Sequence, residues 1–103
     1  MKTPKKRKNF KINLYGQEWS VEYHSPIIEE GQRAYGLCCP ESKTLYIDAT
    51  LDDEMTAVTF FHELFHAYVR RMGVINASLS SELEELIADQ FGQLIAENFD
   101  FDL

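Results

Sequence analysis

Cysteine, histidine, glycine and proline are all scarce in this 103-residue chain, with two, three, five and three copies. The two cysteines, Cys38 and Cys39, are adjacent, and neighbouring residues rarely satisfy disulfide geometry, so the sequence has no disulfide framework. We expect both thiols to pack as strand residues rather than to bind a metal with His24, because adjacent cysteines chelate poorly. Free thiols also favour a reducing, cytoplasmic compartment.

The chain also lacks a long apolar run and an excess of positive charge. No segment approaches the roughly 20 apolar residues that span a bilayer, and the opening Met-Lys-Thr-Pro-Lys-Lys-Arg-Lys lacks the apolar stretch of a signal peptide. The net charge of -7, from 17 acidic and 10 basic residues, argues against a nucleic-acid surface. We therefore expect a cytoplasmic protein with neither membrane nor nucleic-acid partners.

The length fits one compact domain, and a hydrophobic content of 45% is enough for one modest core. Residues 1–9 contain the basic run from Lys2 to Lys8. Because like charges repel one another, this run predicts a solvated, disordered tail. The single domain is expected over residues 10–103.

Alternation of apolar and polar residues at period two predicts β-strands in the first half of the domain. The predicted strands are residues 10–15, 18–23, 34–39 and 44–48. A turn at Gly16-Gln17 makes the first two a β-hairpin, and the turn-rich residues 40–43 make the last two a second hairpin. Residues 27–32 form a looser stretch between them. We expect a small antiparallel sheet of three or four strands.

From residue 50 the apolar period becomes that of a helix, so two helices complete an α+β fold. Thr50 followed by Asp53 resembles a capping box at the first helix start, and Gly73 falls where a left-handed C-cap suits glycine. Ser81 followed by Glu84 predicts the start of the second helix in the same way. The apolar stripe expected on the second helix is Leu83, Leu86, Ile87, Phe91, Leu94 and Ile95.

The segment His62-Glu63-Leu64-Phe65-His66 is an HExxH motif in the middle of the first predicted helix. Residues four apart share one helix face, so the two imidazoles can converge on a single zinc ion. Glu63 projects beside them, where its carboxylate can act as general base on a metal-activated water. With only three histidines in the chain, this placement predicts a metal site.

A catalytic zinc site normally has three protein ligands, so a further ligand is expected from the second helix. Glu82, Glu84 and Glu85 cluster in its first turn. Glu85 is the preferred ligand, because it lies between the leucines and isoleucine expected to be buried, whereas Glu82 and Glu84 are expected to be solvated. Asp89, four residues on, is expected to accept a hydrogen bond from the outer nitrogen of a ligating histidine. Glu82 and Glu84 remain alternative ligands.

A zinc peptidase also needs a group that stabilises the oxyanion of its tetrahedral intermediate. His24, Tyr35 and Tyr68 are all available for this role, and the sequence does not choose among them. Arg70 and Arg71 are interpreted as charges at the negative end of the helix dipole. The alternative for one of them is to bind a substrate carboxylate.

These residues resemble the short gluzincin-type metallopeptidases of phages and mobile elements, including the ImmA/IrrE-like group. In that group the second helix carries the pattern E-x-x-A-x-x-F-A-x-x-L, whose glutamate is the third zinc ligand. Here the pattern falls on Glu85, Ala88 and Phe91, with Gly92 in place of the second alanine. The resemblance covers roughly residues 35–98 and implies a minimal zincin-like fold. It also implies limited proteolysis of a cytosolic regulator.

We therefore predict a zinc-dependent hydrolase that cleaves a peptide or protein substrate, with Zn2+ held by His62, His66 and Glu85 and with Glu63 as general base. The alternative is a catalytically silent zinc-binding module with a regulatory or interaction role. A purely structural zinc site is disfavoured because such sites prefer cysteine. An extended substrate is expected to add as a strand to a sheet edge, for which residues 45–48 are the candidate.

Overall fold

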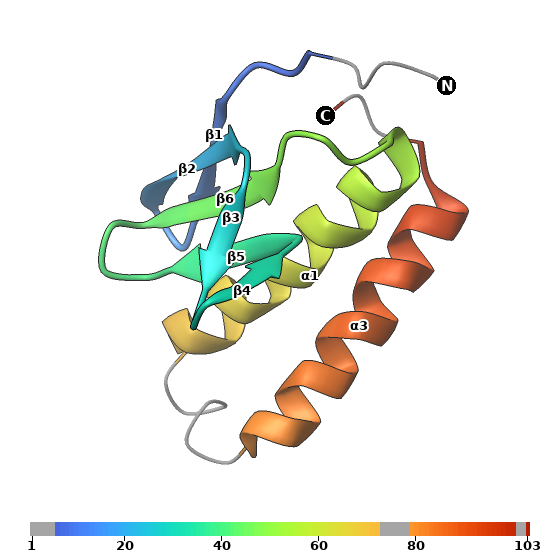
Figure 1. Ribbon diagram of the computed structural model, residues 1–103. Coiled ribbons are helices and arrows are strands. Elements are labelled where there is room, and N and C mark those ends of the chain that lie inside the picture. The colour runs from blue at the N-terminus through green and yellow to red at the C-terminus, as the bar shows by residue number, and fades with distance from the viewer. Residues whose placement is uncertain (1–5, 73–78, 101–102) are drawn as a thin grey trace.

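The computed structural model describes residues 6–72, 79–100 and 103, with the side chains of residues 71 and 72 left out. It is an α+β fold with a mostly antiparallel sheet and two helices. As Figure 1 shows, α1 lies between the sheet and α3, so the molecule has three layers. The predicted cap at Gly73, most of the loop before the second helix and residues 1–5 lie outside the described residues.

The four-stranded sheet has the order β1-β2-β6-β5, and β3 and β4 form a separate two-stranded hairpin. The strands are β1 (Phe10–Leu14), β2 (Gln17–His24), β3 (Ile27–Glu29), β4 (Gln32–Ala34), β5 (Gly36–Cys39) and β6 (Thr44–Asp48). The helices are α1 (Asp53–Met72) and α3 (Ser81–Asn98).

Both predicted hairpins are confirmed, since β1 pairs antiparallel with β2 and β5 pairs antiparallel with β6. The first turn lies one residue earlier than expected, at Tyr15 and Gly16, whose φ angles are 50° and 76°. Two successive positive φ angles match the twist of a two-residue hairpin, and glycine adopts such an angle without steric cost.

The expectation of a purely antiparallel sheet is wrong, because β2 and β6 pair in parallel, with Val21 opposite Leu45. Between these strands the chain folds residues 27–34, expected to be a looser stretch, into the β3–β4 hairpin, and then forms β5. This excursion brings β6 back beside β2 in the same direction. As a result β6 is an inner strand, and the edge strands of this sheet are β1 and β5, so the candidate edge at residues 45–48 is also wrong.

The first helix is capped by Asp52 rather than by Thr50. The Asp52 carboxylate accepts a hydrogen bond from the Met55 backbone N–H at 2.8 Å. Thr50 instead donates its hydroxyl to the Asp48 carboxylate at 2.7 Å, so it has no part in the helix. The capping residue is therefore the aspartate immediately before the first helical residue, as N-cap chemistry favours.

The second helix is capped by Ser80, whose hydroxyl oxygen accepts from the Leu83 backbone N–H at 3.1 Å. The predicted cap at Ser81 is therefore one residue late, and Glu84 serves no capping box. The Glu84 side chain is instead buried against α1.

The face of α3 that packs on α1 carries two small residues. Ala88 and Gly92 are buried there, and a Cβ at Gly92 would lie 2.6 Å from the Val58 carbonyl oxygen of α1. The predicted apolar stripe is therefore wrong as a buried face, since only Phe91 and Ile95 pack against the core. Its other four members are exposed: Leu83, Leu86, Ile87 and Leu94.

The core lies between the sheet and α1. Its buried members are Leu14, Trp19, Val21, Cys38, Leu45, Ile47, Phe60, Phe61 and Ala67. Described residues ahead of β1 are held to this body, because Arg7 donates to the Leu51 carbonyl at 3.3 Å and Asn9 accepts from the Tyr23 N–H at 2.9 Å. In the described part of the chain, neither helix is long and apolar enough to cross a membrane.

Candidate metal centre

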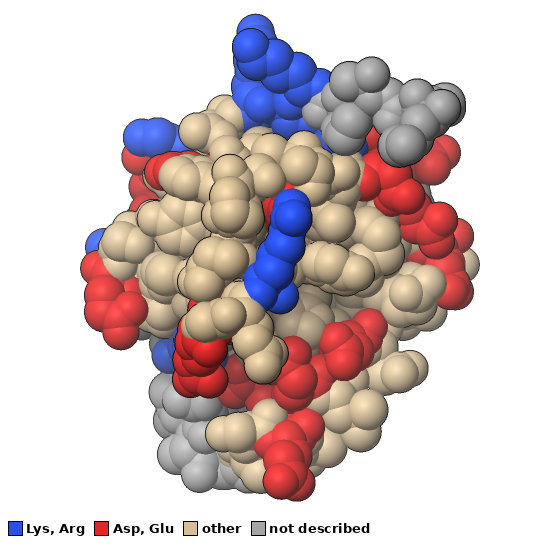
Figure 2. Space-filling model, viewed as in Figure 1, with Lys and Arg blue, Asp and Glu red and all other residues tan. Residues whose placement is uncertain are grey.

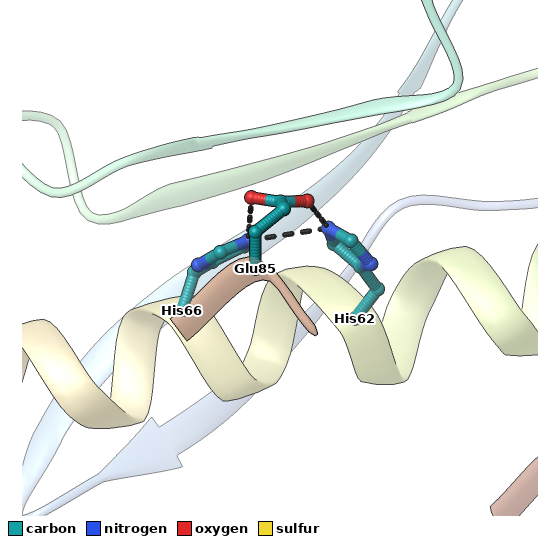
Figure 3. A group of neighbouring side chains, drawn as sticks. All are labelled: His62, His66 and Glu85. Carbon is teal, nitrogen blue, oxygen red and sulfur yellow. Dashed lines mark hydrogen bonds and ion pairs between the residues drawn. The ribbon is translucent and has the colours of Figure 1, made fainter. Parts of the chain in front are cut away.

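The structure brings His62 and His66 of α1 together with Glu85 of α3 (Figure 3). The Nε2 atoms of the two imidazoles are 3.2 Å apart. The two carboxylate oxygens of Glu85 lie 2.8 Å from His62 Nε2 and 3.1 Å from His66 Nε2. Ligands around a tetrahedral zinc ion, each roughly 2.0–2.2 Å from it, are on the order of 3.4 Å from one another, so these atoms are almost correctly spaced.

Each histidine also has a carboxylate on its outer nitrogen, Nδ1. Asp89 Oδ1 lies 2.8 Å from His62 Nδ1, as the sequence predicted for this residue. Glu84 contacts His66 Nδ1, and both side chains are buried. Glu84 was expected to be solvated, and that expectation is wrong because Glu84 shares the α1-facing surface of α3 with Ala88 and Gly92.

These contacts fit a metal ion. A carboxylate at Nδ1 makes that nitrogen the protonated one in a neutral imidazole, so each Nε2 carries a lone pair. The lone pairs of His62 and His66 then face each other and the carboxylate of Glu85. Three electron-pair donors at 2.8–3.2 Å repel one another, and either a proton or a metal cation among them removes that repulsion. Two imidazoles and one carboxylate are a donor set that zinc binds.

Glu63 lies beside this group, with one carboxylate oxygen 4.0 Å from His62 Nε2. The side chain is buried under β5, and a Cβ added at Gly36 would come within 3.0 Å of Glu63 Cγ. Burial, together with the negative charges of Glu85 and Glu29, raises the pKa of Glu63 to about 8. The glycine in β5 therefore lets the strand lie directly over the predicted base.

Comparison of the chain with protein-family models, with curated proteins and with solved structures finds no match. The geometry of these side chains is therefore the observation that bears on function. Glu82, the remaining glutamate of the first turn, is exposed and is not part of the group.

The candidate metal centre opens into a cleft of about 660 Å³ between α3 on one side and β5 with the β3–β4 hairpin on the other. Of the three possible oxyanion donors, Tyr35 lines this cleft. His24 instead contacts Glu22 at 3.0 Å, and Tyr68 shares a hydrogen bond of 2.9 Å with the hydroxyl of Tyr15. Arg70, near the end of α1, also lines the cleft, with its Nε 4.0 Å from Glu84.

The hairpin wall of the cleft is anchored by Asp48 at the end of β6. Asp48 is buried, and its Oδ2 accepts from Arg33 of β4 at 2.9 Å, while its Oδ1 accepts from the Thr50 N–H at 2.8 Å. Burial alone would raise the pKa of Asp48, but the hydrogen bonds from Thr50 and Arg33 outweigh it and lower that pKa. This ion pair fixes the β3–β4 hairpin, and with it Tyr35, at the mouth of the cleft.

The two cysteines are free, as expected, and occupy strand β5. Cys38 is buried, and burial raises the pKa of its thiol to about 12. A thiol with such a pKa is protonated at neutral pH and is a poor metal ligand. Among the described residues, His24 and the cysteines form no metal-binding group.

Proposed function

We propose that this protein is a zinc-dependent metallopeptidase with a minimal zincin-like arrangement. The observation that carries the proposal is the convergence of two imidazole nitrogens and one carboxylate beside a buried glutamate, all facing one open cleft. His62, His66 and Glu85 would hold the metal, and Asp89 and Glu84 would orient the two imidazoles.

The proposed chemistry is hydrolysis of a peptide bond. A zinc ion bound here would acidify a water molecule and polarise the substrate carbonyl. The positive charge of that zinc would lower the raised pKa of Glu63, so its carboxylate would accept the proton of the attacking water and then donate it to the leaving amine. Tyr35 is the proposed hydrogen-bond donor to the oxyanion, because it alone of the three sequence candidates lines the cleft.

The substrate is proposed to bind in an extended conformation along β5. In the described part of the chain β5 pairs only with β6, so the backbone groups on its outer edge are not used by the sheet. Gly36, Leu37 and Cys38 of this strand line the cleft, which places the edge beside Glu63. A peptide added to this edge would run past the metal centre, with its backbone hydrogen-bonded to β5.

The test is cleavage of a mixed-sequence peptide library, read by mass spectrometry, with zinc measured in the same samples. Glu63→Gln is expected to keep its zinc and to lose at least about a hundredfold in cleavage rate, because general-base catalysis is removed. Glu54→Gln, an exposed substitution in the first turn of α1, is the matched control and should cleave like wild type. Zinc binding without any cleavage by wild type would support the silent binding module instead.

A further inference from the structure

The outer face of α3 carries four large aliphatic side chains that the fold leaves in water. Leu83, Leu86, Ile87 and Leu94 are 46%, 56%, 37% and 59% exposed. At 3.6 residues per turn, Leu83, Ile87 and Leu94 fall within an arc of about 40°, with Leu86 on its flank. These four residues, called here the outer stripe, form an apolar surface of the helix, with the exposed Gln90 lying among them between Ile87 and Leu94.

The outer stripe is not needed to attach α3 to the molecule. That role belongs to the buried Ala88 and Gly92, of which Gly92 lies against the backbone of α1, and to Phe91 and Ile95 at the edge of the core. Glu85 and Asp89 occupy the sector that faces the metal centre. A helix that is apolar on both its inner and its outer face typically packs against a second partner through the outer face.

Charge distinguishes between the possible partners. α3 carries Glu82, Glu84, Glu85, Asp89 and Glu97, and the chain has no lysine or arginine after Arg71. Figure 2 shows acidic side chains gathered along the α3 side of the molecule. Glu97 and Glu82 flank the outer stripe, so two copies packed antiparallel through α3 would bring these carboxylates together, each chain carrying a net charge of -7.

We infer that the outer stripe docks a basic amphipathic helix of a partner protein. The apolar face of such a helix covers the four aliphatic side chains, and its lysines or arginines meet Glu82 and Glu97. This binding surface is separate from the metal centre and does not require that the protein cleave peptides.

The experiment uses an 18-residue fluorescent probe peptide of leucine and lysine, with leucines at helical spacing, and a scrambled peptide of the same composition. Fluorescence anisotropy with full-length protein should show binding of the helical probe at least about tenfold tighter than binding of the scrambled one. The double variant Leu86→Gln/Leu94→Gln should lose at least about tenfold in affinity for the helical probe. Ile28→Gln, at an equally exposed aliphatic residue of β3, is the control and should bind like wild type.

Thermal melts of the three proteins should coincide, because no substituted side chain belongs to the core. Equal affinity for helical and scrambled peptides, or unchanged affinity in the double variant, would overturn the inference. A wild-type dimer in sedimentation that the double variant abolishes would overturn it too, since a second copy would then be the occupant. The anisotropy and sedimentation measurements are made with EDTA present, so that neither zinc binding nor cleavage of the probe affects them.

Discussion

At the scale of single residues, His62 and His66 each have a carboxylate on the nitrogen that points away from Glu85. Such contacts fix the tautomer and the ring orientation of a ligating histidine. Glu84→Gln and Asp89→Asn should therefore each weaken zinc affinity by roughly 10- to 100-fold, as measured by competition with a chromophoric chelator. Glu82→Gln, in the same helical turn, is the control, and an equal loss in that variant would show a general charge effect instead.

The sequence indicated the positions of four residues in this group and misplaced the fifth, Glu84. The four are His62, His66, Glu85 and Asp89. HExxH spacing fixes His62 and His66 on one helix face, and Asp89 was expected from its place one turn after Glu85. The expectation that Glu84 is solvated is wrong because it assumed that the leucines of the second helix are buried. The phase argument for Glu85 is wrong for the same reason. Glu85 nevertheless lies at the histidines because it borders the small-residue face of α3.

At the scale of the elements, the close approach of α1 and α3 depends on Gly92. Alanine usually stabilises a helix by about 1 kcal/mol relative to glycine. Here its Cβ would meet the Val58 carbonyl oxygen at 2.6 Å, which is backbone and cannot rotate away. Gly92→Ala should therefore destabilise the protein by about 1–3 kcal/mol and weaken zinc binding, because Glu85 moves with α3.

Urea unfolding and zinc titration of Gly92→Ala, beside the exposed substitution Gln90→Ala on the same helix, test this prediction. Gln90→Ala should change the unfolding free energy by no more than about 0.5 kcal/mol. A Gly92→Ala protein that is more stable than wild type would mean that a methyl group fits between the two helices.

The sequence predicted which segments are strands and helices more accurately than it predicted which strands pair with one another. Period-two and helical periodicities predicted the β1–β2 and β5–β6 hairpins and both helices, because these patterns are local, but the β3–β4 hairpin was missed. The parallel pairing of β2 with β6 depends on the path of the intervening chain, which no local pattern records. The position of β5 at an edge of the sheet follows from that pairing. Small residues at a helix contact were also missed, since a search for large apolar residues does not detect them.

At the scale of the whole molecule, the core lies between the sheet and α1, apart from the metal ligands. The protein should therefore remain folded without metal, unlike a structural zinc domain. At free zinc of a hundred times Kd, binding contributes about 2.7 kcal/mol, which for a domain of this size corresponds to a shift of about 10–20 °C in Tm. Adding EDTA should lower the Tm by that amount and leave the far-ultraviolet circular dichroism at 25 °C unchanged.

Loss of the helical signal at 25 °C on chelation would instead assign the metal a structural role. Titration with magnesium in place of zinc is the control for this measurement. It should not restore the Tm, because magnesium prefers six oxygen ligands to imidazole nitrogens.

His62, His66 and Glu85 are proposed to bind one zinc ion. Elemental analysis of purified wild type, His62→Ala and Glu85→Ala tests it, with His24→Ala and Glu82→Ala as controls from outside the group. We predict one zinc per chain in wild type and in both controls, and loss or strong weakening of zinc binding in the other two variants. Absence of zinc from wild type, or normal binding by Glu85→Ala, would contradict the ligand set proposed here.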